Sequence, residues 1–546
     1  MSNRYEGSQP PPSTAPSASL QRTIGLKGLV FALIGSTIGS GWLFAGLYAA
    51  QIAGPAALLA WGIGGLVVFL FSLAYMELGI AFPISGGMVK YSQFSHGSLV
   101  GFLAGLSGWL CYVMVAPLEV LAILQYASNY LPWLARDQGS AADLTPAGYA
   151  VAIALLLLLT LVNLTAIRWV IRIHNRIVDW KLIIPIATLV LLFSVDFHPE
   201  NFTAHGGFFA MGPASMLTAI MAGGILYSTY GFRVVVDLAG EARNPGRDIP
   251  RAIALGLGAV VLFYALLQTA FLGALRPEDL AHGWGQLSFP GMTGPYAALL
   301  TAGGLAWMAA ILYADAIISP VGTGLIFSTS TSRIAMAMSE TRYFPAVFAP
   351  LNRKGIPARA IGLNFAVGLV LFAPLPDWQA VVSFGAAATV LSFGFAQITL
   401  ASMRRVGLPL TSRFRVRGVG GLAWGNFVVI NALLFAVGWE SNRMLLLVLL
   451  ACFALFGIHR WRSRWPVSRL DLRSAPWLTT YLLWVFLSSW LGPFGGGQGW
   501  LKAGAGFLLQ AVVSTLLFLW ALRCSHSREE MEREIERAGP VREAET

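Results

Sequence analysis

Two stretches of small and polar residues interrupt apolar segments of the chain. Residues 35–42 (GSTIGSGW) lie within an apolar segment of roughly residues 28–50, and residues 227–233 (YSTYGFR) lie within roughly 214–238. Glycine in a helix interior costs about 1 kcal/mol relative to alanine, so both stretches favour broken helices. Inside a membrane such a break is tolerated only where the freed backbone is buried in protein or faces a wet cavity. The first stretch therefore predicts either an anion site at the following N–H groups or a small-residue packing face.

The composition is that of a helical membrane protein. The 546 residues are 56% hydrophobic and only 11% charged, which is outside the range of soluble globular proteins. A net charge of +11 would suggest nucleic acid as a partner of a soluble chain. Here Lys and Arg gather in short loops, where they orient the spans. The three cysteines show no disulfide or metal-ligand pattern, and we expect no metal, cofactor or nucleic-acid partner.

The hydropathy pattern predicts about fourteen membrane spans. They are roughly 28–50, 56–82, 97–131, 147–167, 177–195, 214–238, 251–275, 296–332, 358–374, 378–403, 420–438, 443–459, 474–491 and 502–523. With the N-terminus in the cytoplasm, the outward loops and span edges carry only Arg136, Arg276, Arg443 and Lys502. This asymmetry predicts a multi-pass protein of the plasma (inner) membrane with both termini cytoplasmic.

The two interrupted spans, 1 and 6, are separated by five positions in the order of spans, so they would lie in opposite orientations. Paired interruptions of this kind indicate an inverted-repeat transporter. We therefore expect residues 25–404 to form a ten-helix transport core, with spans 1–5 and 6–10 as the repeats. We expect residues 1–24 to be a disordered cytoplasmic N-terminus, 405–523 to form accessory spans 11–14, and 524–546 to be a charged cytoplasmic tail.

Several motifs, in their order and spacing, resemble amino acid permeases of the amino acid–polyamine–organocation superfamily. Besides residues 35–42, they are 77–79 (ELG) with 82–83 (FP) and 86–87 (GG), 231–232 (GF) with 240–245 (GEARNP) and 249–253 (IPRAI), and 332–333 (SR) with 355–357 (GIP). The resemblance implies an all-α integral membrane protein with a LeuT-type 5+5 inverted repeat. It also implies alternating access driven by an ion gradient, most often of protons.

An amino acid substrate is implied by the same resemblance. Its carboxylate suits the N–H groups near Ser40, Gly41 and Trp42, and its ammonium suits freed carbonyls in spans 1 and 6. The predicted substrate-binding residues are Thr37, Ile38, Gly39, Ser40, Gly41, Trp42, Tyr227, Ser228, Thr229, Tyr230, Gly231, Phe232 and Arg233.

Arg233 is the least expected of these residues, because the family usually carries Glu or another residue at this position. A charge at membrane depth is costly and usually functional. A guanidinium binds a carboxylate through two hydrogen bonds, so Arg233 either recognises an acidic side chain or pairs structurally with Glu119, Asp237 or Asp315. Further motifs resemble the aspartate–proton symporter branch, and this resemblance implies L-aspartate or L-glutamate as the substrate. They are 117–119 (PLE), 125–126 (QY), 231–233 (GFR), 237–241 (DLAGE), 315–316 (DA) and 319–324 (SPVGTG). The alternative is an amino acid exchanger, or a proton symporter for neutral amino acids, with Arg233 as an ion-pair partner.

The proton-coupling candidates are Lys181, Glu119, Asp315, Ser319 and Thr323. In proton-coupled relatives a lysine matching Lys181 occupies the place of sodium, which implies contacts with span 1 carbonyls and with Ser319 or Thr323. Lys181 would otherwise snorkel to the membrane surface or pair with Asp179. Glu119 and Asp315 lie deep in spans 3 and 8, where each either exchanges a proton or neutralises Arg233.

An integral membrane enzyme is the rival class of protein. It would need a nucleophile, a base or metal ligands near one membrane face. The sequence contains no HExxH motif, no G-x-S-x-G on a strand–helix turn and no metal-ligand cluster. We therefore expect a transporter without enzymatic activity.

Overall fold

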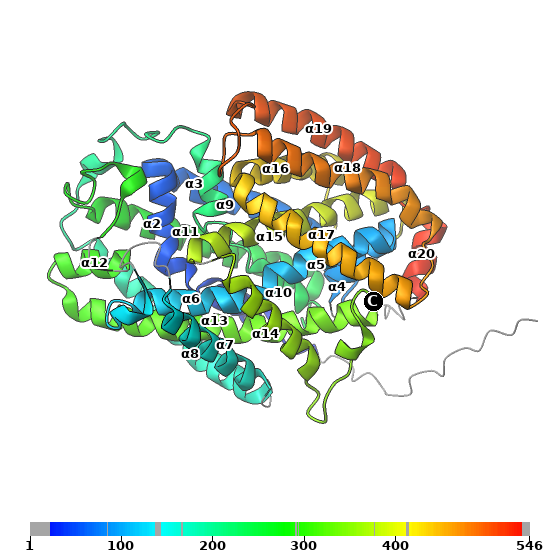
Figure 1. The fold of residues 1–546 in the computed structure, drawn as a ribbon, viewed down its shortest axis with the longest axis horizontal. Helices are drawn as coiled ribbons and strands as arrows, with labels where there is room; N and C mark the ends of the chain where they lie inside the picture. The colour runs from blue at the N-terminus through cyan, green and yellow to red at the C-terminus, as the bar shows by residue number, and fades with distance from the viewer. Residues whose placement is uncertain are drawn as a thin grey trace, which may run out of the picture.

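Long apolar helices make up the structure, a computed structural model (Figure 1). It describes residues 22–84, 86–136, 144–164, 167–289, 292, 294–375, 377–410 and 414–537, without the side chains of residue 88 and residues 167–178. The predicted disordered N-terminus lies almost wholly outside the described residues, as does the end of the predicted charged tail. Within the described part, the only β-structure is two isolated bridges, between Ile24 and Ala242 and between Ala135 and Leu144.

The α-helices follow one another without strands between them. They are α1 (Leu26–Thr37), α2 (Gly41–Ala53), α3 (Ala57–Ala81), α4 (Gly87–His96), α5 (Ser98–Val113), α6 (Val115–Ala127), α7 (Pro146–Asn163), α8 (Ile167–Leu192), α9 (Ser215–Ala222), α10 (Phe232–Asp237), α11 (Pro245–Ala274), α12 (Pro295–Ala302), α13 (Ala306–Glu340), α14 (Ala358–Phe372), α15 (Trp378–Arg405), α16 (Val419–Val437), α17 (Trp439–Arg462), α18 (Arg469–Leu491), α19 (Ala503–Cys524) and α20 (Arg528–Arg537).

Nine helical stretches in the described part of the chain are long and apolar enough to cross a membrane. Two shorter apolar helices, α1 and α14, accompany them. A span that is broken into two short helices is not counted among these stretches, because neither half is long enough to cross a membrane alone. The count of fourteen spans therefore stays a prediction, as do the domain boundaries and the orientation of the termini.

Both predicted helix breaks are present. Helix α1 ends at Thr37 and α2 begins at Gly41, while α9 ends at Ala222 and α10 begins only at Phe232. Glycine and serine supply the local reason in span 1, because their helix propensity is low and span 1 has three glycines and two serines in eight residues.

Two details of the helix pattern differ from the prediction. Span 3 is divided at Met114 into α5 and α6, next to Pro117, whose missing N–H removes one helical hydrogen bond. The predicted span 8, residues 296–332, joins what are two helices, α12 and α13. The turn between them contains Gly304 with φ +77°, which an L side chain rarely adopts.

The accessory helices α16 to α19 lie along one side of the core, with α18 beside α19 and α16 against α15 (Figure 1). Asp471, in the first turn of α18, is the centre of one connection to the core. Its carboxylate accepts hydrogen bonds from Ser98 Oγ at 2.8 Å, from the Leu99 N–H at 3.2 Å and from Arg460 Nη2 of α17 at 2.8 Å. We call these four residues the α18 anchor. The α18 anchor attaches the start of α5, next to the end of α4, to helices α17 and α18.

We expect Asp471→Asn to lower the thermal stability of the purified protein. Asp471 is 1% exposed, and breaking a buried ion pair by removing one charge typically costs about 3–5 kcal/mol, because it leaves the other charge uncompensated. Thermal unfolding in detergent, followed by intrinsic fluorescence, measures the change.

The matched control is Glu532→Gln, which removes the exposed partner of Arg528. Exposed ion pairs contribute about 0–1 kcal/mol, so this variant should unfold at nearly the wild-type temperature. Equal unfolding temperatures for Asp471→Asn and the control would contradict the role given to the α18 anchor.

Candidate functional site

The two helix breaks touch one another. A methyl group built on Gly231 would lie 2.1 Å from Thr37 Oγ1, and one built on Gly41 would lie 2.3 Å from Ser228 Oγ. A side chain at either position would force the facing hydroxyl group to move, so glycine lets spans 1 and 6 pack closely here. The predicted binding residues of the two spans are therefore adjacent in space.

Ser40, the N-cap of α2, is bonded by residues from two other parts of the chain. Its N–H donates to the Glu119 carboxylate, with the nitrogen 3.0 Å from Oε2 and 3.3 Å from Oε1. Tyr227 donates its hydroxyl to Glu119 Oε1 at 2.5 Å, and Trp378 Nε1 donates to Ser40 Oγ at 2.8 Å. A carboxylate of the chain thus lies where the sequence predicts an anionic ligand.

Lys181 reaches the other side of the span 1 break. Its ammonium donates to the Gly35 carbonyl at 3.3 Å and to Thr323 Oγ1 at 2.5 Å. Thr323 in turn donates to the Ile38 carbonyl at 3.4 Å. These are span 1 and span 8 partners of the kind expected for Lys181, whose coupling role stays a prediction.

Asp315 and Ser319 form a separate group. Asp315 accepts from Trp42 Nε1 at 3.0 Å and from Ser319 Oγ at 2.6 Å, and the Trp42 ring stacks on Tyr296 with 5.8 Å between centroids. This geometry orients Trp42. Of the two span 8 hydroxyls proposed for Lys181, the structure brings Thr323 to it, whereas Ser319 bonds Asp315.

Arg233 lies in an aromatic cage built from three other helices. Its guanidinium carbon is 5.6 Å from the ring centroid of Tyr75 in α3, 5.1 Å from that of Tyr112 in α5 and 5.4 Å from that of Phe393 in α15. Its Nη1 is 3.7 Å from Cys111 Sγ, and the side chain is 1% exposed. Cation–π contacts of this kind stabilise a desolvated guanidinium.

Of the three carboxylates proposed as partners of Arg233, Asp237 interacts with it electrostatically, whereas Glu119 and Asp315 bond other groups. Glu119 and Asp315 direct their oxygens to Ser40 and Trp42, as described above. Asp237, one helical turn after Arg233, accepts from the Tyr112 hydroxyl at 3.2 Å, which connects it to the cage through Tyr112.

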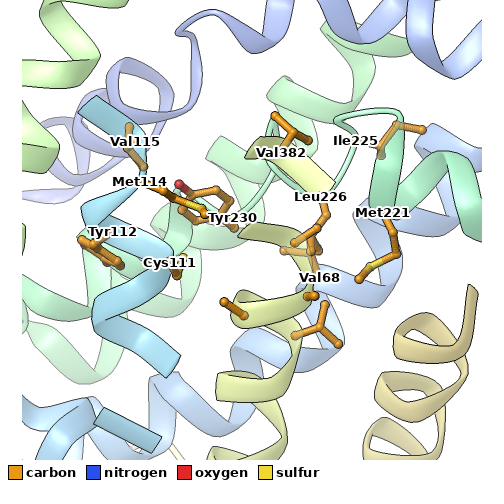
Figure 2. Close-up of a cluster of buried hydrophobic side chains, with 14 of the residues drawn as sticks. Val68, Cys111, Tyr112, Met114, Val115, Met221, Ile225, Leu226, Tyr230 and Val382 are labelled. Carbon is orange, nitrogen blue, oxygen red and sulfur yellow. The ribbon is translucent and has the colours of Figure 1, made fainter. Parts of the chain in front are cut away.

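Of the remaining predicted residues of span 6, Ser228 faces Gly41 of span 1, Thr229 bonds its own backbone, and the aromatic residues pack into the core. Thr229 donates to the Ile225 carbonyl at 2.8 Å. Phe232 packs against Phe393, with 5.5 Å between centroids. Figure 2 shows Tyr230 reaching toward Met114 and Cys111 at the division of span 3. The structure therefore gathers Ser40, Glu119 and Tyr227 around one point and places Tyr230 and Phe232 in hydrophobic packing.

Trp378 is a site residue that the sequence analysis missed. It begins α15, where Asp377 accepts the Ala380 N–H at 2.8 Å and caps the helix. Its ring lies 6.1 Å from that of Tyr227, edge to face. Asp377 before an apolar run was the available signal for this helix start, but nothing local indicates that Trp378 points at span 1.

The site is closed in this structure. Ser40, Glu119 and Lys181 are each 0% exposed, and Ile38 is 4% exposed. A ligand reaches these groups only after the surrounding helices move, as in transporters and enzymes whose sites close around their ligands.

The comparisons agree with this architecture. The chain matches the family profile described as "Amino acid permease" over residues 24–489. It is 36% identical to the glutamate/serine transporter AimA of Bacillus subtilis (strain 168), over 93% of this chain and 95% of that protein. It is 31% identical to the aspartate-proton symporter of the same organism, over 92% of this chain and 96% of that protein.

A solved structure supports the fold alone. Mhp1, a nucleobase-cation-symport-1 family transporter in a closed conformation with bromovinylhydantoin bound, aligns with a TM-score of 0.52 at 15% identity, over 96% of this chain and 99% of that one. The predicted LeuT-type class is thereby confirmed. Fold and relatives are those of multi-pass membrane transporters and not of enzymes.

Because the profile spans most of the chain and two relatives exceed 30% identity over nearly its whole length, the chain belongs to the amino acid permease family of the amino acid–polyamine–organocation superfamily and is a secondary amino acid transporter.

Proposed function

We propose that this transporter couples the uptake of an acidic amino acid, L-aspartate or L-glutamate, to protons by alternating access across the plasma membrane, with both termini in the cytoplasm. The observation that carries the proposal is the Ser40 N–H at the start of α2, which holds a carboxylate at 3.0 Å between the two broken spans. A helix N-terminus favours negative charge, so the same N–H suits the α-carboxylate of a substrate. The two relatives, a glutamate/serine transporter and an aspartate-proton symporter, support the substrate and the proton.

Arg233 is the proposed selector of the acidic side chain. Its position two residues after Gly231 puts it on the half-helix that follows the span 6 break. The guanidinium would leave part of its aromatic cage to meet the substrate carboxylate, an exchange of cation–π contacts for a bidentate ion pair. Such a residue disfavours a cationic substrate, because like charges in a low dielectric repel strongly.

A second candidate function also has an observation in its favour. Three aromatic rings from other helices surround Arg233 in this structure, and one relative carries serine as well as glutamate in its name. Arg233 would then be structural, and the protein would exchange neutral amino acids or transport them with protons.

Lys181 is the proposed coupling residue. Its ammonium connects the Gly35 carbonyl of span 1 to Thr323 of span 8. Loss of its proton would weaken that connection and release the broken span, which is what coupling between protonation and reorientation requires.

Wild-type protein in proteoliposomes should take up labelled L-aspartate or L-glutamate when the outside is acidic, without sodium. The inward proton gradient supplies the driving force, so a protonophore should abolish accumulation. Competition by unlabelled aspartate, glutamate, serine and lysine measures selectivity. Uptake inhibited only by neutral amino acids would overturn the acidic substrate in favour of the second candidate.

We expect Arg233→Ala to reduce aspartate and glutamate uptake by about 10- to 100-fold, the usual range for losing a hydrogen bond to a charged group. Serine uptake, where the wild type shows it, should change by less than about threefold, because serine has no side-chain carboxylate for Arg233 to bind. The ratio of the two initial rates is the measurement.

Arg233→Lys is the companion variant, since it keeps the charge and the volume but loses the planar fork. It should retain folding and recover only part of the aspartate uptake. If Arg233→Ala lowered serine and aspartate uptake equally, Arg233 would be a structural residue and not a selector.

We expect Lys181→Ala to bind and exchange substrate with little dependence on pH, because the group that gains and loses the proton is gone. Initial exchange rates between pH 5.5 and 8.5 measure this dependence. Asp179→Asn is the control, since exposed Asp179 is the alternative partner of Lys181. A wild-type pH profile in Lys181→Ala would transfer the coupling role to Glu119 or Asp315.

A further inference from the structure

Glu119 occupies the position that the proposed function gives to the substrate carboxylate. Both of its oxygens lie within 3.3 Å of the Ser40 nitrogen, and the side chain is fully buried. A methyl group on Gly39 would lie 2.6 Å from Glu119 Oε1, so the carboxylate rests directly against the break in span 1. Tyr227 holds the same oxygen from span 6 at 2.5 Å.

From this geometry we infer that Glu119 is an internal stand-in for the substrate carboxylate, which lets the carrier close and return without substrate. The inference rests on the proposed binding mode and adds to it a mode of transport. It makes the protein a net transporter and not an obligatory exchanger.

The physical reason is the freed backbone at the break. When the site closes, the Ser40 N–H leaves water, and a buried donor without an acceptor is unfavourable. In the loaded carrier the substrate carboxylate accepts this hydrogen bond. In the empty carrier Glu119 accepts it, so both forms can pass through the closed conformation that alternating access requires.

The substrate and Glu119 exclude one another at this position. Two carboxylates cannot share one N–H within about 3 Å while both are ionised, because like charges at this separation repel. Binding of substrate therefore displaces Glu119 from Ser40, and release of substrate lets Glu119 return. Lys181 stands at the other side of the same break, at Gly35.

The test compares two transport modes in proteoliposomes at equal pH on both sides. Exchange is measured with vesicles preloaded with unlabelled amino acid, and net uptake with empty vesicles and an inward concentration gradient. Exchange needs only the loaded carrier to reorient, whereas net uptake also needs the empty carrier to return.

Glu119→Ala should lower the ratio of net uptake to exchange by about 10- to 100-fold, the range expected when a buried donor loses a charged acceptor. Glu119→Gln should keep the wild-type ratio, because its amide oxygen still accepts from the Ser40 N–H. Thr331→Val is the control for a buried hydroxyl outside the site, since Thr331 bonds only its own helix, at the Phe327 carbonyl.

Glu119→Asp distinguishes two roles of Glu119: replacing the substrate carboxylate at Ser40, and only gaining and losing a proton. Aspartate titrates like glutamate but is one methylene shorter, so Glu119→Asp should lower the ratio of net uptake to exchange. An equal fall of this ratio in Glu119→Gln and Glu119→Ala, or a wild-type ratio in Glu119→Asp or Glu119→Ala, would overturn the inference. Loss of exchange in every Glu119 variant, with the control intact, would make Glu119 a structural residue and would also overturn it.

The proposed acidic substrate is tested separately, by exchange measurements on the wild-type protein. The variants are compared with whichever amino acid the wild type exchanges, so a wild type that ignores aspartate and glutamate overturns the acidic substrate and leaves the comparison among Glu119 variants intact.

Discussion

The hydrogen bond from the Ser40 N–H to the Glu119 carboxylate gives a partner to a backbone group that the break in span 1 leaves free. A helix broken inside a membrane is the main constraint on this fold. Freed backbone groups in that environment must find partners within the protein. Three of them do so around span 1: the Ser40 N–H at Glu119, the Gly35 carbonyl at Lys181 and the Ile38 carbonyl at Thr323. The partners come from spans 3, 5 and 8, so the break is stable only in the assembled core.

The same constraint gives the site its chemistry. On the proposed binding mode, the backbone groups freed by the break are also the groups that a zwitterionic ligand binds, and the side chains that bond them compete with that ligand. The same bonds would then set both the stability of the break and the affinity for substrate. Trp378 and Tyr227 add to this balance, because they hold Ser40 Oγ and Glu119 from outside span 1.

Sequence reasoning succeeded where the cause is local or chemically rare. The breaks at residues 38–40 and 223–231 follow from glycine and serine in apolar segments, although the second begins four residues before the predicted stretch 227–233. Glu119 and Lys181 stand out because charges inside spans are uncommon, and both contact the span 1 break, while their role in coupling stays a prediction. It failed where the cause is tertiary. Nothing near Trp378 indicates its bond to Ser40, and the cage of Arg233 draws its rings from three spans far apart in sequence.

Span 3 connects the accessory helices to this centre. Ser98, the first residue of α5, belongs to the α18 anchor, and Trp109 donates to Asn364 of α14 at 3.0 Å. Further along, Glu119 meets Ser40, and the Tyr126 hydroxyl donates to the Leu43 carbonyl of α2 at 3.3 Å. Contacts to the accessory helices lie at one end of the span and contacts to broken span 1 at the other. On the proposed binding mode, the bonds that exchange during transport are made to a helix whose far end is held by the buried charges of the α18 anchor. We therefore expect the broken span 1, and not span 3, to be the part that moves.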